Sequence, residues 1–147
     1  MIIGSKLAFE DNPPFDHPST YRSLIGALQY LTLTRPDLSF VVNKLSQFLK
    51  APIVNHWQAC KHVLRYVQGP LHHGLTFTKS DTLQLEGYAD VDWASNISDR
   101  KSTSGYCIFL GSNLVQWSSK KQAVVVLSSA RAEYRALAQA SIEIAWL

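Results

Sequence analysis

The hydrophobic repeat of the chain changes at Gly69-Pro70, and this change limits the folds that are open to it. Before Gly69, apolar residues recur every three to four positions, which is typical of amphipathic helices that pack through one side. After Pro70 they alternate with polar residues, which is typical of β-strands with two different faces. The pattern therefore predicts an α+β protein with a helical first half and a second half built mainly from strands.

Prolines divide the helical half into an irregular segment and three helices. Residues 1–20 are rich in proline, which removes backbone donors and restricts the preceding residue, so this segment is predicted to be irregular. Ser19 or Thr20 could then cap the first helix. No predicted helix carries a charged cluster on its apolar side, so we interpret the three helices as packing elements. They are expected within 21–33, 38–49 and 55–67.

The second half is predicted to be an antiparallel meander followed by one helix. Strands are expected over 74–78, 83–93, 103–110 and 114–118, separated by polar turns. The strand over 103–110 is apolar on both faces and is therefore expected to be central. A final helix is expected to start at Ser128-Ser129, to pack against the sheet and to run to the chain end. Its predicted apolar stripe is Ala130, Tyr134, Leu137, Ala138, Ser141, Ile144 and Ala145.

Three acidic residues of the second half are candidates for metal chemistry. Strand alternation places Asp90 and Asp92 on one face, roughly 7 Å apart along the chain. Glu133 lies on the flank of the final helix's apolar stripe, from which it could reach the end of the sheet. Mg²⁺ prefers octahedral coordination by oxygen, so the carboxylates that hold it must converge from different elements. Two such ions can promote phosphodiester hydrolysis. A solvated polar strand face is the alternative, and spacing alone favours it over a metal site.

Basic residues offer weaker evidence for a nucleic-acid interface. The net charge of +3 permits contact with a polyanion without requiring it. Lys120 and Lys121, expected in a loop after Trp117, and Arg100 in the polar loop 95–101 are candidates for contacting phosphates. A solvated basic loop fits the same residues equally well. Other cations that could touch phosphates are Lys61, Arg65, Arg131 and Arg135.

The remaining composition points to a soluble intracellular protein. Cys60 and Cys107 lie far apart, without zinc-ligand spacing, and are expected to be reduced. No run approaches the ~18 apolar residues of a membrane span, so no membrane partner is expected. The first residues also lack the charged and apolar regions of a signal peptide.

From residue 21 onward the chain closely resembles the Pol polyproteins of copia-type retrotransposons of plants, at the end of the reverse transcriptase and the start of the ribonuclease H domain. The resemblance rests on several words in family order. They are Tyr-Arg-Ser-Leu-Ile-Gly-Ala-Leu-Gln-Tyr-Leu (21–31), Thr-Arg-Pro-Asp-Leu (34–38), His-Trp-Gln-Ala (56–59), Leu-Arg-Tyr-Val-Gln-Gly (64–69), Gly-Tyr-Ala-Asp-Val-Asp-Trp-Ala (87–94), Asp-Arg-Lys-Ser-Thr-Ser-Gly-Tyr (99–106) and Trp-Ser-Ser-Lys-Lys-Gln (117–122).

The resemblance implies that residues 21–72 form the helical end of a reverse transcriptase and 73–147 the first part of a ribonuclease-H-like domain. The intact family hydrolyses the RNA strand of RNA–DNA hybrids with Mg²⁺ or Mn²⁺. Matched by motif, Asp90 is the catalytic aspartate of the first strand and Glu133 the catalytic glutamate of the helix, and both would bind metal. Asp92 is a possible supporting ligand. The implied partners are an RNA–DNA hybrid and the rest of the polyprotein, in the cytoplasm or a virus-like particle.

The chain departs from the family pattern in two ways. The family reads Ser-Ser-Thr-Glu-Ala-Glu-Tyr where this chain has Ala130 and Arg131 before Glu133. Arg131 forms no capping box and places a cation in the first helical turn, a loss of about 1 kcal/mol. The family's later Asp-Asn strand and a further acidic residue are not within the 147 residues, and no Tyr-x-Asp-Asp polymerase word occurs.

We expect a truncated ribonuclease-H-like domain that does not cleave hybrids by itself and has no polymerase activity. The alternative is a non-catalytic remnant that binds nucleic acid or protein. The number of convergent carboxylates separates the two possibilities.

Overall fold

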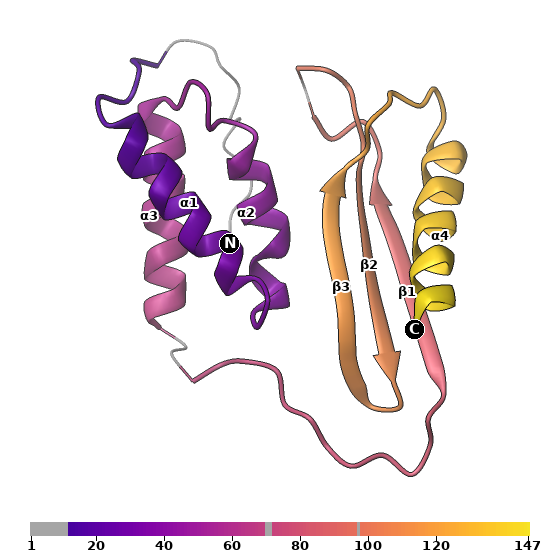
Figure 1. Cartoon of the computed structure of the whole chain (residues 1–147). Helices are drawn as coiled ribbons and strands as arrows, with labels where there is room; N and C mark the ends of the chain where they lie inside the picture. Colours follow the sequence, from indigo (N-terminus) through magenta and orange to yellow (C-terminus); the bar gives the residue numbers. More distant parts are fainter. Residues whose placement is uncertain (1–11, 70–71, 97) are drawn as a thin grey trace. The chain divides into compact units, whose positions relative to one another are not determined.

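The computed structural model describes residues 12–69, 72–96 and 98–147, and it divides the chain into two compact units (Figure 1). The first unit is Met1–His73 and the second is Gly74–Leu147. The first contains helices only, apart from one isolated β-bridge, and the second contains three strands and a helix among the residues described. The α+β class predicted from the hydrophobic repeat is confirmed.

The helices of the first unit are α1 (Pro18–Leu31), the short 3₁₀-helix η1 (Pro36–Leu38), α2 (Ser39–Ser46) and α3 (Val54–Gln68). They pack around one apolar core because each helix has an apolar stripe of helical period. Within that core the Tyr21 hydroxyl donates a hydrogen bond to the Leu45 carbonyl at 2.8 Å. The core residues are Tyr21, Ile25, Leu28, Leu38, Val42, Leu45, Cys60 and Val63.

The start of the first unit differs from the prediction. Helix α1 begins at Pro18 rather than after Ser19 or Thr20, because proline suits the first helical turn, where its missing N–H needs no partner. Residues 1–11 of the expected irregular segment lie outside the described residues. Its later part is held in place, since Pro14 forms a β-bridge with Ile53. The second predicted helix is also shorter, because η1 forms its first turn and α2 ends at Ser46.

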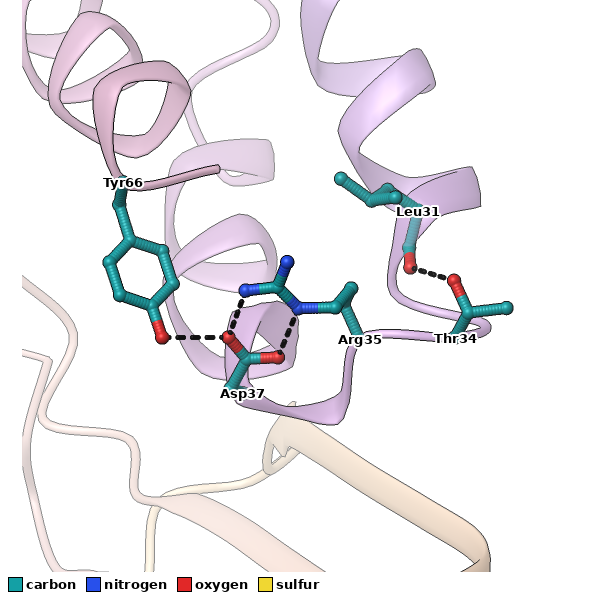
Figure 2. A network of polar contacts seen from close by, with 5 residues as sticks. All are labelled: Leu31, Thr34, Arg35, Asp37 and Tyr66. Carbon is teal, nitrogen blue, oxygen red and sulfur yellow. Dashed lines mark hydrogen bonds and ion pairs between the residues drawn. The ribbon is translucent and has the colours of Figure 1, made fainter. Parts of the chain in front are cut away.

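A buried arginine fastens the turn between α1 and η1 to α3 (Figure 2). Arg35 donates from Nε to one oxygen of Asp37 at 2.9 Å and from a terminal nitrogen to the other at 2.8 Å. Tyr66 of α3 donates its hydroxyl to the same carboxylate at 2.9 Å, and its ring lies against the guanidinium. The hydrogen bond from Arg35 is the main reason why the pKa of Asp37 is lowered.

The strands of the second unit are β1 (Leu85–Asp92), β2 (Thr103–Leu110) and β3 (Asn113–Lys121), and they form an antiparallel sheet in the order β1-β2-β3. Strand β2 is central, as predicted from its two apolar faces. The turn from β2 to β3 contains Gly111 at φ +57, where a Cβ would clash with the Ser80 side chain. This turn therefore requires glycine.

Two predictions about strands are wrong. Residues 74–78 form no strand, because the Thr78 N–H and carbonyl bond the side-chain amide of Asn113 at 2.7 and 2.8 Å instead of a neighbouring strand. Strand β3 continues to Lys121, so Lys120 and Lys121 are not in a loop. Both lysines pair with residues at the start of β2.

Helix α4 (Ser129–Trp146) runs alongside β1 and contacts β1 and β2 (Figure 1). The helix starts where it was expected, and Ser128 caps it by accepting a hydrogen bond from the Arg131 N–H at 3.3 Å. The predicted apolar stripe is wrong, because Tyr134 and Leu137 are 72% and 52% exposed. Small side chains face the sheet instead and allow the helix to approach it closely. These buried residues are Ala132, Ala136 and Ala140.

Among the residues that the structure describes, no helix combines the length and the apolar character needed to cross a membrane.

Candidate functional site

Asp90 lies near the carboxyl-terminal end of β1 with its side chain exposed. One carboxylate oxygen accepts a hydrogen bond from the N–H of Val91 at 2.8 Å. Its partner on β2 is Gly105, which has no side chain to cover the carboxylate. Asp92, also exposed, pairs with Thr103 at the end of the strand. Both carboxylates are therefore open to a ligand that arrives from solvent.

The sheet has one face covered by α4 and one face that carries the two aspartates. Gly87 contacts Ile144 of α4, so α4 covers the face to which the odd-numbered residues of β1 point. Asp90 and Asp92 alternate to the other face, which they share with Glu86 and Tyr88. Helix α4 therefore packs against the face of β1 that was predicted to be apolar, and the polar face is left uncovered.

Glu133 lies in the first turns of α4 and is exposed. The preceding residue, Ala132, is fully buried, and its carbonyl accepts a hydrogen bond from Gln122 Nε2 at 3.2 Å. Gln122 Nε2 also donates to the Ser104 hydroxyl at 2.7 Å, and Ser104 is paired with Val91. The Gln122 side chain thus links the start of α4 to the level of the sheet at which Asp90 lies. Asp90 and Glu133 are therefore at the same end of the second unit, but Asp90 points to the face of the sheet that α4 does not cover.

The acidic residues that the structure describes do not make a complete metal site. Carboxylates are the ligands that Mg²⁺ and Mn²⁺ prefer, so Asp90, Asp92 and Glu133 are suitable by donor type. In the described part of the chain, however, no three His, Cys, Asp or Glu side chains come together as a group that could hold a metal ion. The donor chemistry fits a divalent cation, whereas the number of converging ligands does not.

The two lysines at the end of β3 lie on opposite faces of the sheet. Lys121 pairs with Thr103 and so shares the face of Asp92, and its ammonium group forms an ion pair with Asp99 at 2.7 Å. Burial acts to raise the pKa of Asp99, but hydrogen bonds from the Lys121 side chain and the Lys101 N–H, with both positive charges, outweigh it and lower this pKa. Lys120 points to the α4 side. The pair is therefore not one basic patch.

Arg100 belongs to the turn that joins β1 to β2. Its backbone is in the left-handed region, with φ at 55, and its N–H donates to the Asn96 carbonyl at 2.8 Å. The side chain is exposed. Among the three main candidates for contacting phosphates, Arg100 and Lys120 form no ion pair within the described residues, whereas Lys121 pairs with Asp99.

A groove between the sheet and α4 was not predicted from the sequence. Its volume is about 410 Å³, and it is lined by residues of β2 and β3 on one side and of α4 on the other. Lys120, Gln122 and Arg135 are part of its wall. The alternation of β3 indicates that Ser118 and Lys120 point to the same face of the sheet. Which side chains of β2 lie beside them depends on the register of the two strands, which the sequence alone does not give.

The chain is similar in sequence to transposon polyproteins of plants. It is 46% identical over 147 residues to the Retrovirus-related Pol polyprotein from transposon RE2 of Arabidopsis thaliana, covering 100% of this chain and 10% of that protein. It is 41% identical over 128 residues to the Retrovirus-related Pol polyprotein from transposon TNT 1-94 of Nicotiana tabacum, covering 86% of this chain and 10% of that protein. The chain thus spans about a tenth of the length of these relatives.

A shorter relative is covered over most of its length. The Secreted RxLR effector protein 161 of Plasmopara viticola is 50% identical over 128 residues, which make up 86% of this chain and 90% of the relative. No protein-family model matches the chain, and no solved structure matches it.

Proposed function

Because the chain belongs to the Pol polyproteins of copia-type retrotransposons, we propose that its second unit supplies part of the active site of a ribonuclease that acts on RNA–DNA hybrids. Asp90 and Glu133 are the residues that carry this function in the proposal. The hydrogen bonds of Gln122 to Ala132 and Ser104 support it most directly, because they hold the start of α4 at the level of Asp90. The two residues come from different elements on opposite sides of the sheet, so a cation that both hold would lie at the end of the sheet.

The proposed roles follow from the chemistry of the side chains. A divalent cation, when bound, would polarise the phosphodiester and activate a water molecule. Asp90 and Glu133 would hold the cation, and Asp92 would assist from the end of β1. Exposed Arg100, in the turn that follows β1, would contact the phosphates of the hybrid, whereas Lys120 points to the opposite face of the sheet. The helical first unit has no catalytic role in this proposal and serves as the packed end of the reverse transcriptase.

We further propose that the 147-residue chain does not cleave hybrids on its own. The described residues contain no group of three potential ligands, and two carboxylates hold a divalent cation weakly. The additional carboxylates would come from elsewhere in the polyprotein, which is about ten times longer in the transposon relatives. The same observation favours a second candidate, a nucleic-acid-binding segment that has no catalytic role even in the polyprotein.

One experiment separates these candidates. The region of the RE2 polyprotein that matches this chain is replaced by the chain. Cleavage of a fluorescently labelled RNA–DNA duplex by this exchanged polyprotein is then measured with Mg²⁺ or Mn²⁺. We expect cleavage by the exchanged polyprotein and none by the 147-residue chain. Asp90→Asn or Glu133→Gln should each reduce the rate at least about 100-fold, as expected for the loss of a group that acts in the transition state.

Asp81→Asn is the matched control, since Asp81 is an exposed carboxylate outside the strands. It should leave the rate unchanged. Full activity of the Asp90→Asn variant in the exchanged polyprotein would contradict the proposed role. Cleavage by the 147-residue chain alone would contradict the need for further carboxylates. An exchanged polyprotein that folds and binds the hybrid without cleaving it would favour the non-catalytic candidate.

A further inference from the structure

One side of α4 faces the groove beside β3 rather than the sheet beneath the helix. Residues of α4 at positions i, i+3, i+4, i+7 and i+8 line it, starting from Arg135 and ending at Glu143. At a rise of 1.5 Å per residue this stripe is about 12 Å long. The opposite wall includes Tyr106 of β2 and Lys120 of β3. The volume of about 410 Å³ is within the range of small-molecule sites, about 300–1,000 Å³.

The two ends of the groove differ in charge. Lys120 and Arg135 are at one end, both are exposed, and neither forms an ion pair among the residues that the structure describes. Glu143 is at the other end, where its carboxylate accepts hydrogen bonds from Gln116 and Gln139. Because these amide donors are neutral, they do not cancel the negative charge. Lys121 also lines the groove, but its ammonium group forms an ion pair with Asp99, so a ligand along the groove meets Lys120 and Arg135 as the cations at one end.

The middle of the groove is apolar and partly aromatic. Ile142 is 54% exposed although it is a large hydrophobic side chain, and Ala138 lies one helical turn before it. Tyr106 is half-buried in the facing wall, and burial is the main cause that raises its pKa, so its phenol stays neutral near pH 7. A flat ring could cover this surface and remove it from water.

We propose that this groove binds a phosphate-bearing nucleotide, with the phosphate between Lys120 and Arg135 and the base against Tyr106 and Ile142. A cationic end beside an aromatic and apolar wall is the combination that holds single-stranded nucleic acid in other proteins. The nucleotide can be free or part of a strand. This site lies on the face of the sheet opposite to Asp90, so it does not depend on the proposed ribonuclease activity.

The test is a titration of the 147-residue chain with a fluorescein-labelled oligothymidylate, a mononucleotide and inorganic phosphate. We expect Lys120→Gln/Arg135→Gln to weaken oligonucleotide binding at least about tenfold and to make its salt dependence shallower by about one unit of slope. The matched control is Arg22→Gln/Lys79→Gln, which removes the same charge from two exposed cations elsewhere. The control should stay within about twofold of the parent chain, since surface charge alone contributes little specificity.

A second variant tests the groove itself. Ala138→Trp fills the groove without changing charge and should also weaken binding at least about tenfold if the base lies there. Circular dichroism confirms that each variant is folded. Binding that is unchanged by Ala138→Trp, or that falls equally in the control pair, would overturn the proposal. So would an acidic peptide of equal charge that binds as tightly as the oligonucleotide. Mononucleotide affinity equal to that of the oligonucleotide would identify a free nucleotide as the ligand.

Discussion

Gly87 of β1 and Ile144 of α4 lie so close that a Cβ on Gly87 would stand 2.5 Å from Cδ1 of Ile144. This contact defines the face of the sheet that α4 covers. It also assigns the two faces of β1, because successive strand residues point in opposite directions. Asp90 and Asp92 lie on the uncovered face for this reason, and Lys120 lies on the covered one.

The first prediction concerns this contact. Gly87→Ala should destabilise the second unit by about 1 kcal/mol, because the new methyl group forces Ile144 to shift in a close interface. Urea unfolding measures the change. Gly74→Ala is the control, since a Cβ at Gly74 would meet no atom within 4 Å, and it should have no such cost. Adding Ile144→Ala should remove most of the penalty of Gly87→Ala, and strictly additive effects would contradict the proposed contact.

The second prediction uses the two neighbouring lysines. Lys121→Gln should raise the pKa of Asp99, because it removes a hydrogen bond and a positive charge that hold this pKa down against the effect of burial. The titration of the Asp99 carboxyl carbon followed by NMR measures the shift. Lys120→Gln removes the same charge one residue away on the other face and should leave the pKa unchanged. An equal shift in both variants would mean that the two lysines do not lie on opposite faces.

The third prediction concerns the buried Arg35. Because its hydrogen bond is the main factor that lowers the pKa of Asp37, Asp37 contributes stability above its unfolded pKa, about 3.9. That contribution should be lost as the pH falls below about 4 toward the folded pKa. Arg35→Met should lower the free energy of unfolding by about 2 kcal/mol at pH 7. It should also reduce the further decrease in stability that accompanies the protonation of Asp37 at low pH.

Hydrogen exchange of the first unit at pH 7 and below pH 4 measures both effects. Tyr66→Phe serves as the milder companion variant, since it removes one hydrogen bond and keeps the ion pair, with an expected cost of about 1 kcal/mol. An Arg35→Met variant that retains the full pH dependence of the parent chain would show that Arg35 does not control the titration of Asp37.

The fourth prediction concerns the reactivity of the two free thiols. Burial raises the pKa of Cys60 to about 11 and also raises that of Cys107, which is less buried. A disulfide reagent such as Ellman's reagent needs the thiolate, so at pH 8 Cys60 should react only after unfolding and Cys107 more readily. Cys107→Ser leaves Cys60 as the reporter of unfolding of the first unit. Rapid labelling of Cys60 in the folded variant would contradict its burial.

Local pattern predicted which elements form but not how far they extend. The apolar stripes located α1 and α3, and the alternation located β1 and β2, because these periods follow from the geometry of a single element. The end of β3 was missed, because its last residues are held by pairing with Thr103 and Ser104 rather than by their own propensity. The predicted strand over 74–78 failed for the related reason that Thr78 bonds a side chain.

The sequence by itself determined the helical and β halves, the central position of β2, the start of the last helix at Ser128-Ser129 and the chain's membership of a transposon polyprotein family. These depend on local periodicity, on capping chemistry and on the order of short motifs. Only the tertiary structure decided that α4 packs against the sheet through its alanines and that Lys120 and Lys121 lie on opposite faces of the sheet. It also decided that Gln122 links α4 to the level of Asp90. Those outcomes depend on strand register and on how closely a helix can approach a sheet, and both are set by residues far apart in the chain.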